Sequence, residues 1–202
     1  MKQFCFLSEN VKNKLKIYEN NLKKWQSKIN LVSSSTLNDV YERHFYDSLQ
    51  LWELIPKNAK TLIDFGSGAG FPALVLAILN QEENNGKIKI SLVESDARKC
   101  AFIEQTARLC GVQVSIINKR IEDIEPFEAD VVTARALASL DKLLDYSRDF
   151  VSDKSLCLFL KGEKVDEEIE NAKKKYRFDY EKISSQTNKN SSVLIIKGGI
   201  YE

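Results

Sequence analysis

A glycine-rich segment between an apolar run and a helical pattern places the strongest constraint on the fold of this chain. It reads Asp64-Phe-Gly-Ser-Gly-Ala-Gly-Phe71. Residues 61–65 before it are apolar enough for a buried strand, and residues 72–79 after it have a helical apolar pattern. Glycine tolerates positive φ and lets a ligand approach the backbone closely. A strand, a glycine turn and a helix in this order are typical of a nucleotide site at the carboxyl edge of an open α/β sheet.

The chain beyond this turn alternates between apolar strand-like runs and helical patterns. Strands are expected over 87–93, 112–117, 129–133 and 156–160, and helices over 97–109, 140–150 and 165–175. A closing hairpin is expected from residues 176–183 and 193–197. Repeated strand–helix units predict an α/β fold with a mostly parallel, twisted sheet and helices on both faces.

About 55 residues of helical pattern precede the first predicted strand. One helix is predicted by apolar side chains that recur every three or four positions, at Leu15, Tyr18, Leu22, Trp25 and Ile29. A second helix is expected from about Thr36 to Ile55, because the following Pro56 disfavours a helical residue before it. We therefore predict an N-terminal helical extension over 1–57, packed on a main domain over 58–202.

Charge and cysteine usage restrict the classes of partner. The net charge is +1, but residues 1–30 hold seven lysines and only two acidic residues, which suits either a polyanion contact or a solvated helix face. The four cysteines are scattered and there is one histidine, so neither a metal site nor a disulfide framework is expected. No apolar run approaches the roughly 18 residues that span a bilayer, so we expect a cytoplasmic protein with no membrane partner.

Spacing within the glycine turn distinguishes between cofactors. A dinucleotide fingerprint is GxGxxG, but Phe71 stands at the place of its last glycine. The carboxylate of Asp64 would repel a pyrophosphate and suits an ammonium or sulfonium group. Glu94, at the end of the next strand, can accept hydrogen bonds from both ribose hydroxyls of an adenosine. We therefore predict S-adenosylmethionine as the cofactor, with the following residues around it: Asp64, Gly66, Gly68, Gly70 and Glu94.

Two kinds of methyl transfer are disfavoured by the residues present. The (Asn/Asp)-Pro-Pro-aromatic turn used for exocyclic amines is absent, since the fourth strand ends in Thr133-Ala-Arg-Ala. No cysteine lies at a strand end where it could attack a pyrimidine ring. An acceptor with a free lone pair, such as guanine N7, needs no general base, and positioning can supply most of the rate. No residue is therefore assigned as an acid, base or nucleophile.

Five ordered motifs resemble those of one enzyme family. They are Trp25-Gln-Ser-Lys-Ile-Asn30-Leu-Val with Arg43-His-Phe-Tyr-Asp-Ser48, the turn from Asp64 to Pro72, Arg120-Ile-Glu122, Thr133-Ala-Arg135-Ala-Leu, and Lys161-Gly162. This pattern resembles the RsmG (GidB) family, the bacterial 16S ribosomal RNA guanine N7-methyltransferases. Two departures are Gln26 for an asparagine, expected to weaken a local cap or turn, and Ala73 for a glycine.

The resemblance implies a class I, Rossmann-like methyltransferase fold. It also implies methyl transfer from S-adenosylmethionine to N7 of one guanine in 16S rRNA, at position 527 in standard rRNA numbering, with the free rRNA, the 30S subunit or an assembly intermediate as partner. Carried over by position, it places these residues in the cofactor site: Gly66, Phe71, Ile121, Glu122 and Arg135. Arg135 is a candidate for positioning, through either the methionine carboxylate or an RNA phosphate.

Other residues of these motifs are candidates to face the RNA, namely Asn30, His44, Asp47 and Lys161. For His44 a structural hydrogen-bond network is the first expectation, and a catalytic triad with Asp47 and Ser48 is disfavoured because no nucleophile elbow is present. Lys161 suits either a phosphate contact or a solvated position. Three alternatives stay open: a methyltransferase of a protein or small molecule, a non-catalytic S-adenosylmethionine-binding protein, and a nicotinamide oxidoreductase. A monomer is expected.

Overall fold

The computed structural model describes residues 7–202 and contains one seven-stranded sheet in the order β3-β2-β1-β4-β5-β7-β6. Its strands are β1 (Thr61–Phe65), β2 (Lys89–Val93), β3 (Ser115–Ile117), β4 (Val131–Arg135), β5 (Leu156–Lys161), β6 (Arg177–Ser184) and β7 (Ser192–Tyr201). Strands β1 to β5 pair in parallel, whereas β7 pairs antiparallel with both β5 and β6. The predicted α/β fold with a mostly parallel sheet and a closing hairpin is confirmed.

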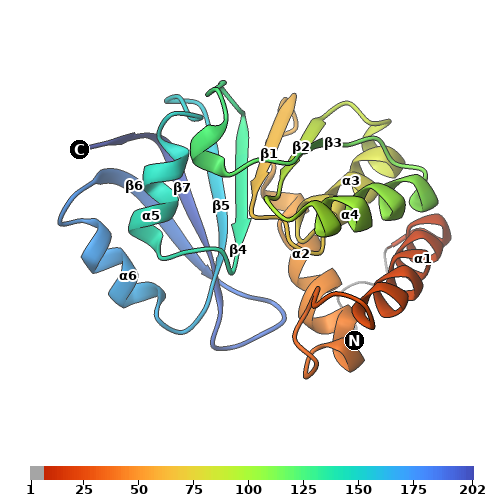
Figure 1. The fold of residues 1–202 in the computed structure, drawn as a ribbon. Helices are drawn as coiled ribbons and strands as arrows, with labels where there is room; N and C mark the ends of the chain where they lie inside the picture. Colours follow the sequence, from red (N-terminus) through yellow and green to blue (C-terminus); the bar gives the residue numbers. More distant parts are fainter. Residues whose placement is uncertain (1–6) are drawn as a thin grey trace.

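Helices cover both faces of this sheet (Figure 1). They are α1 (Glu9–Gln26), α3 (Ala73–Asn84) and α4 (Ala97–Cys110) on one face, and α5 (Leu140–Ser147) and α6 (Val165–Ala172) on the other. Each face has its own hydrophobic core, because the parallel strands are buried on both sides. Gly111 ends α4 in the left-handed conformation, as the sequence predicts for a helix stop.

Helix α1 belongs to the same core as α3 and α4. The side chains of Leu15, Tyr18 and Leu22 are buried against these helices. Polar contacts add to the packing: Asn21 Nδ2 donates to Thr106 Oγ1 at 2.8 Å, and Lys14 Nζ lies 2.9 Å from Glu82 Oε1. The amphipathic pattern in the sequence therefore corresponds to a face that packs on the main sheet domain, buried at Leu15, Tyr18 and Leu22 and partly buried at Trp25, while α1 ends before Ile29.

The predicted helix over 36–55 is wrong. The structure instead has four short turns, a 3₁₀ turn at Leu37–Asp39, a π-helical turn at Tyr41–Tyr46, α2 (Asp47–Leu49) and a 3₁₀ turn at Trp52–Leu54. Val40 and Phe45 are both buried although they lie five positions apart, a spacing that matches the wider π turn better than 3.6 residues per turn. Packing against the main domain therefore overrides the local helical pattern.

The expected weakening at Gln26 is also wrong. Its Oε1 accepts hydrogen bonds from the backbone N–H groups of Leu31 and Val32, at 3.0 and 3.1 Å. Its Nε2 donates to the Val32 carbonyl at 2.8 Å. The longer glutamine side chain thus fixes the loop that follows α1. Ala73, the second departure, is the first residue of α3.

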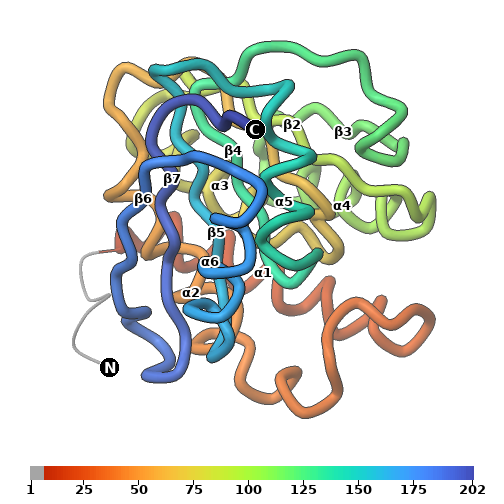
Figure 2. Tube along the Cα trace, turned by 90° about the vertical axis from the view of Figure 1, so that its left-hand side faces the viewer, coloured from red at the N-terminus to blue at the C-terminus, as the bar shows by residue number. Residues whose placement is uncertain are grey.

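The C-terminal hairpin reaches back to the N-terminal segment. Thr187 Oγ1 donates to Asp47 Oδ1 at 3.0 Å, and the Gln186 N–H donates to Gln50 Oε1 at 3.0 Å. Figure 2 shows this hairpin loop beside the orange segment that holds Asp47. Segments from opposite ends of the chain therefore meet at one edge of the molecule.

Three cysteines, Cys100, Cys110 and Cys157, are buried free thiols, as expected from the sequence, while Cys5 lies outside the described residues. Within residues 7–202 no group of three or more His, Cys, Asp or Glu side chains is arranged to hold a metal ion. None of the helices described is both long and apolar enough to cross a membrane.

Candidate cofactor and acceptor site

A cavity of about 420 Å³ opens at the carboxyl ends of β1, β2 and β4, beside the glycine turn. We call it the glycine cavity. It is lined by most of the residues predicted to bind the cofactor, namely Gly66, Gly68, Phe71, Glu94, Ile121, Glu122 and Arg135. Parallel strands that end at one edge bring these positions together, although they are spread over 70 residues of sequence.

The glycine turn is fixed in a conformation that other residues rarely adopt. Gly66, Gly68 and Gly70 have φ angles of +65°, +57° and +87°. A Cβ atom on Gly66 would lie 2.5 Å from Leu137 Cδ1, so a side chain there would push into the cavity wall. Gly70 faces away from the cavity, where a Cβ atom would meet Tyr18 Oη at 2.7 Å.

Glu94 connects the end of β2 to this turn. Its Oε2 accepts a hydrogen bond from the Gly68 N–H at 2.9 Å, and its Oε1 accepts one from the Asp96 N–H at 2.8 Å. A carboxylate has about four acceptor positions, so each oxygen keeps one for a further donor. The side chain is nearly buried yet lines the cavity, which suits it to accept hydrogen bonds from a pair of ligand hydroxyls.

Asp64 does not line the glycine cavity. It is fully buried beneath the turn, where Thr133 Oγ1 donates to its Oδ1 at 2.7 Å and its Oδ2 has no partner. Burial raises the pKa of this carboxyl to about 7, and the hydrogen bond from Thr133 acts in the opposite direction. The structure therefore places Asp64 behind the turn, away from the direct contact that the sequence predicts.

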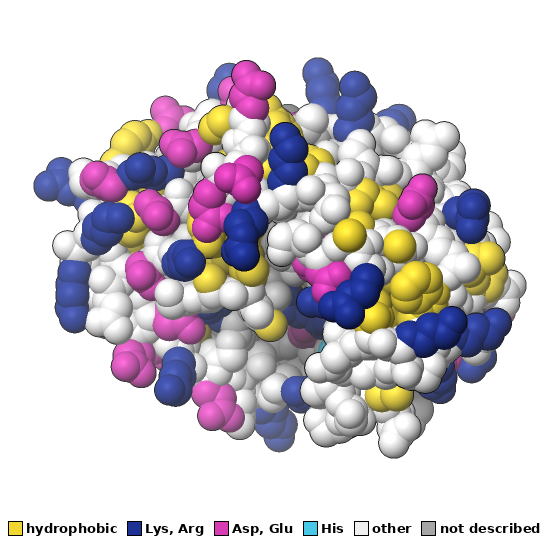
Figure 3. Space-filling model, in the orientation of Figure 1, with side chains coloured by type: hydrophobic (Ala, Val, Ile, Leu, Met, Phe, Trp, Pro, Cys, Tyr) yellow, Lys and Arg dark blue, Asp and Glu magenta, His cyan; other side chains and the backbone are white. Residues whose placement is uncertain are grey.

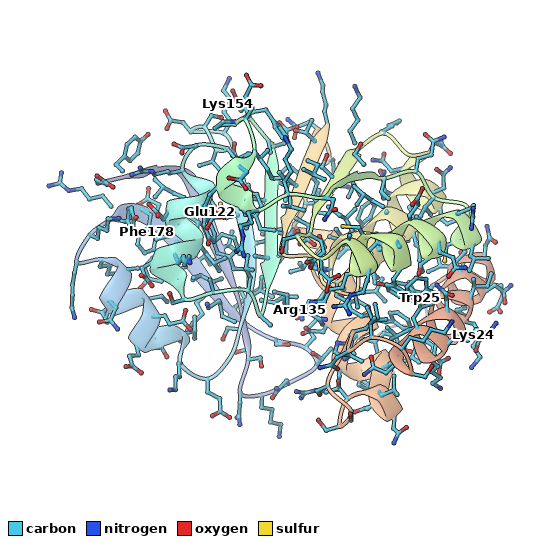
Figure 4. All side chains as sticks on the ribbon, in the orientation of Figure 1. Lys24, Trp25, Glu122, Arg135, Lys154 and Phe178 are labelled. Carbon is cyan, nitrogen blue, oxygen red and sulfur yellow. The ribbon has the colours of Figure 1, made fainter. Side chains whose placement is uncertain are left out.

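The far end of the glycine cavity is polar. Glu122, in the 3₁₀ turn Ile121–Asp123, accepts a hydrogen bond from Tyr146 Oη at 2.8 Å. Figure 4 shows Glu122 beside α5 and Arg135 lower in the molecule, toward the N-terminal segment. Sequence reasoning missed several lining residues, namely Lys99, Lys119, Arg120, Lys142 and Tyr146. Lys119 and Arg120 follow β3 directly, so the strand-end rule could have found them, whereas no local signal marks those on α5.

Arg135 ends β4 and borders a second cavity. Its Nη1 lies 3.5 Å from Asp47 Oδ2 and donates to the Arg43 carbonyl at 3.3 Å. Its Cζ lies 4.7 Å from the centre of the Phe71 ring, a cation–π contact. Burial lowers the pKa of Arg135, and the Asp47 carboxylate opposes that shift, so the guanidinium stays charged.

The second cavity, of about 450 Å³, lies between the N-terminal segment and the ends of β4 and β5. We call it the histidine cavity. Its lining includes Thr36, Arg43, His44, Asp47, Lys161 and Ser191, and it shares Leu31, Arg135 and Ala136 with the glycine cavity. Figure 3 shows this face of the molecule hollowed between its two halves. Two adjacent cavities with one shared wall can hold a donor and an acceptor side by side.

The sequence of the chain matches one known protein family. The model of the family described as "GidB: rRNA small subunit methyltransferase G" matches residues 11–195. The chain belongs to this family. It is 43% identical over 191 residues to "Ribosomal RNA small subunit methyltransferase G" of Paramagnetospirillum magneticum, covering 95% of this chain and 90% of the relative. The resemblance drawn from the sequence motifs is confirmed.

Solved structures agree on the fold of this methyltransferase G family member. A class I S-adenosylmethionine-dependent methyltransferase of Listeria monocytogenes superposes with a TM-score of 0.63 at 15% identity, covering 94% of this chain and 70% of that one. TYW2 of M. jannaschii, solved with AdoMet, gives a TM-score of 0.58 at 16% identity, covering 87% and 80%. These neighbours confirm the predicted class I fold, and membership of the methyltransferase family confirms the predicted cofactor, S-adenosylmethionine.

His44 has a mainly structural environment in this chain. Its Nε2 lies 2.9 Å from Thr36 Oγ1 and its ring stacks on Phe71 with centroids 4.9 Å apart. Burial, followed by the charges of Arg135 and Arg43, lowers the pKa of His44 to about 3, so the ring is neutral at pH 7. Ser48 Oγ donates to the His44 carbonyl and not to its ring, which removes the basis for a hydrolytic triad.

The remaining candidates for RNA contact have different positions. Asp47 lines the histidine cavity, whereas Asn30 is exposed beside it and accepts a hydrogen bond from Gln26 Nε2 at 3.2 Å. Lys161 also lines the histidine cavity, and its side chain is buried, which rules out the solvated position. Its Nζ pairs with Glu168 Oε2 at 2.5 Å and donates to the Ala138 carbonyl at 3.0 Å. A phosphate contact by Lys161 stays a prediction.

Proposed function

We propose that this member of the methyltransferase G family transfers the methyl group of S-adenosylmethionine to N7 of a specific guanine in 16S rRNA. The observation that supports this most strongly is the meeting of two cavities at Arg135 in a chain of this family. The substrate is the rRNA itself, the 30S subunit or an assembly intermediate. Because both cavities are formed within one chain, we also propose that the enzyme acts as a monomer. Because its proposed substrate is ribosomal RNA, we propose that it acts in the cytoplasm.

The glycine cavity has the chemistry that S-adenosylmethionine requires. Gly66 and Gly68 line this cavity with bare backbone, which lets a ligand approach the turn closely. Glu94 is placed to accept hydrogen bonds from the ribose hydroxyls, and Ile121 and Glu122 to contact the adenine. When bound, the cofactor supplies a methyl group on a positively charged sulfur, and this sulfur leaves as a neutral thioether when the lone pair of the acceptor attacks the methyl carbon.

The histidine cavity is proposed to hold the acceptor guanine. Guanine N7 carries its lone pair at neutral pH, so the protein needs no general base for the attack. The neutral ring of His44 lines this cavity and stacks on Phe71, which lines the glycine cavity, so the histidine cavity has one flat, uncharged surface that suits a flat base. Arg135 lies at the shared wall and positions an anionic group, the methionine carboxylate or an RNA phosphate. Positioning and exclusion of water then supply most of the rate.

We further propose that residues 1–57 act as an extension that supplies the acceptor side, while 58–202 bind the cofactor. The extension contributes His44 and Asp47 to the histidine cavity. It also carries exposed lysines at the end of α1, Lys24 and Lys28. Phosphate contacts by lysines give sequence-independent affinity, so selection of one guanine would depend on RNA shape and on the acceptor cavity.

A methyl-transfer assay tests the proposal. Purified protein and labelled S-adenosylmethionine are mixed with 30S subunits, or with their rRNA, from a strain that lacks the enzyme. We expect label at N7 of a single guanine of 16S rRNA. Label on a protein or small molecule in place of RNA would establish the rival acceptor class. Binding of the cofactor without transfer to any of these would favour a non-catalytic role.

A further inference from the structure

Tyr18 of α1 contacts the glycine turn from behind. It is fully buried, and its Oη donates a hydrogen bond to the carbonyl of Ala69, 51 residues further along the chain. Its ring stacks on Phe71, with centroids 5.2 Å apart and planes 9° from parallel. Ala69 and Phe71 both line the glycine cavity, whereas Tyr18 does not. The helical extension therefore supports the turn at Ala69 and at Phe71 without lining the glycine cavity.

The fit between Tyr18 and the turn is close. Gly70 has φ +87°, and a Cβ atom there would lie 2.7 Å from Tyr18 Oη and 3.0 Å from Leu74 Cβ. The tyrosine therefore occupies the space that any side chain at position 70 would need. Burial raises the pKa of Tyr18 well above its ordinary value, so the hydroxyl keeps its proton and can donate at any working pH.

Phe71 connects Tyr18 to the shared wall of the two cavities. Besides Tyr18, its ring contacts His44 at 4.9 Å and the Arg135 guanidinium at 4.7 Å. A row of stacked groups thus runs from α1, through the glycine turn, to the residue at the boundary between donor and acceptor. Displacement of Tyr18 would therefore shift the glycine turn, and through Phe71 it would also shift Arg135.

We propose that Tyr18 is a positioning residue of the cofactor site, so that the affinity for S-adenosylmethionine depends on a hydroxyl that the helical extension supplies. The inference rests on the proposed function only in placing the cofactor in the glycine cavity. The helical extension would then have two roles, contact with the acceptor and support of the cofactor site, because the cofactor site is incomplete without α1.

The test compares two buried tyrosines. Tyr18→Phe removes one oxygen and keeps the stacked ring, and Tyr176→Phe does the same in the other core, where Tyr176 Oη donates to Asp145 Oδ1 at 3.0 Å. Dissociation constants for S-adenosylmethionine and S-adenosylhomocysteine are measured by calorimetry without RNA, together with the thermal midpoint of unfolding. We expect Tyr18→Phe to bind the cofactor about 3- to 10-fold more weakly, and Tyr176→Phe to bind it as the wild type does.

Kinetics separate positioning from general destabilisation. With saturating cofactor, Tyr18→Phe should turn over at close to the wild-type rate while the KM for S-adenosylmethionine rises. Tyr18→Leu, which also loses the stack on Phe71, should lower kcat as well, because Arg135 loses its support. Unchanged affinity in Tyr18→Phe, or an equal loss in Tyr176→Phe, would overturn the proposal. Since cofactor binding is measured without an acceptor, the effect of Tyr18→Phe on cofactor affinity can be determined even if the protein does not methylate rRNA.

Discussion

The two cavities that meet at Arg135 are built in different ways. The glycine cavity is lined almost entirely by residues that follow the ends of β1, β2, β3 and β4, so the order of strands in the sheet creates it. The histidine cavity is assembled from the N-terminal segment, the ends of β4 and β5, and the start of β7. The donor site is therefore a product of sheet topology, and the acceptor site a product of long-range packing.

The two cavities also differ in charge chemistry. The glycine cavity carries two carboxylates, Glu94 and Glu122, which accept hydrogen bonds from hydroxyl and amino groups, and it is also lined by cations, namely Lys99, Lys119, Arg120, Lys142 and the shared Arg135. The histidine cavity carries one carboxylate, Asp47, the cations Arg43, Lys161 and the shared Arg135, and a neutral His44 that suits a flat base. If this difference reflects two ligands, substitutions on one side should affect one ligand's binding and leave the other unchanged.

The largest effect is expected at the shared wall. Arg135→Ala should lower methyl transfer by about 100-fold or more, because the variant lacks the group that fixes the geometry between donor and acceptor. The fold should persist, as judged by circular dichroism. Arg148→Ala, which removes an exposed arginine paired with Glu202 at 2.5 Å, is the matched control and should leave the rate unchanged. Wild-type activity in Arg135→Ala would show that the shared wall has no role.

On the donor side, Gly66→Ala should weaken S-adenosylmethionine binding by about 10-fold. The new Cβ atom would strain a φ of +65° and displace Leu137. Gly162→Ala in the histidine cavity is the control, since a Cβ atom there meets nothing within 4 Å. Calorimetry without RNA measures both variants. Equal losses would contradict the separation of the two cavities.

On the acceptor side, Asp47→Asn should reduce rRNA methylation by about 10-fold with cofactor affinity within about twofold of wild type. The change removes the charge facing Arg135 and disturbs the hydrogen bonds with Gln50 and Thr187. Steady-state kinetics with varied rRNA, set beside cofactor calorimetry, measures the split. A parallel loss of cofactor affinity would mean that the two sides act as one site.

The buried groups on the two sides predict opposite pH effects on stability. The pKa of Asp64 is raised to about 7 from an ordinary 3.8, so the native state holds a proton that the unfolded state releases, and stability falls as pH rises from about 4 to 7. The lowered pKa of His44 acts oppositely, reducing stability as pH falls below 6.5. Asp64→Asn should remove a decline of ~2–4 kcal/mol, measured by urea unfolding at pH 4.5 and 7.5. An unchanged pH dependence in that variant would contradict the assignment.

The smallest effect is expected at the exposed end of α1. Replacing Lys24 and Lys28 with glutamine should lower RNA affinity only a few-fold. The slope of log K against log salt should become shallower by about 0.7 to 0.9 for each phosphate that the variant no longer neutralises. Lys154→Gln is the control, because Lys154 lies at the opposite end of the molecule from Lys24 (Figure 4). A matching change in the control would indicate general electrostatic attraction.

The donor side carries local sequence signals, whereas the acceptor side was indicated only by the family motifs, which contribute His44, Asp47 and Lys161 to the histidine cavity. The turn from Asp64 to Phe71 and the strand ending at Glu94 carry local signals, because glycine conformation and strand periodicity act over a few residues. Around Thr36 to Ile55 a helical pattern is present, yet packing on the main domain breaks it into short turns. The ion pair between Lys161 and Glu168 depends on tertiary packing, and no local pattern predicts it.

The order of strands and helices along the chain, the glycine turn and the acidic residue after β2 could be predicted from local patterns, since each depends on contacts between near neighbours along the chain. The positions of Asp64 beneath the turn, of Tyr18 behind it and of Asp47 against Thr187 at the histidine cavity follow only from the folded structure. These features join residues 51 to 140 positions apart. Burial and long-range packing determine these contacts, and a pattern over a few neighbouring residues predicts neither.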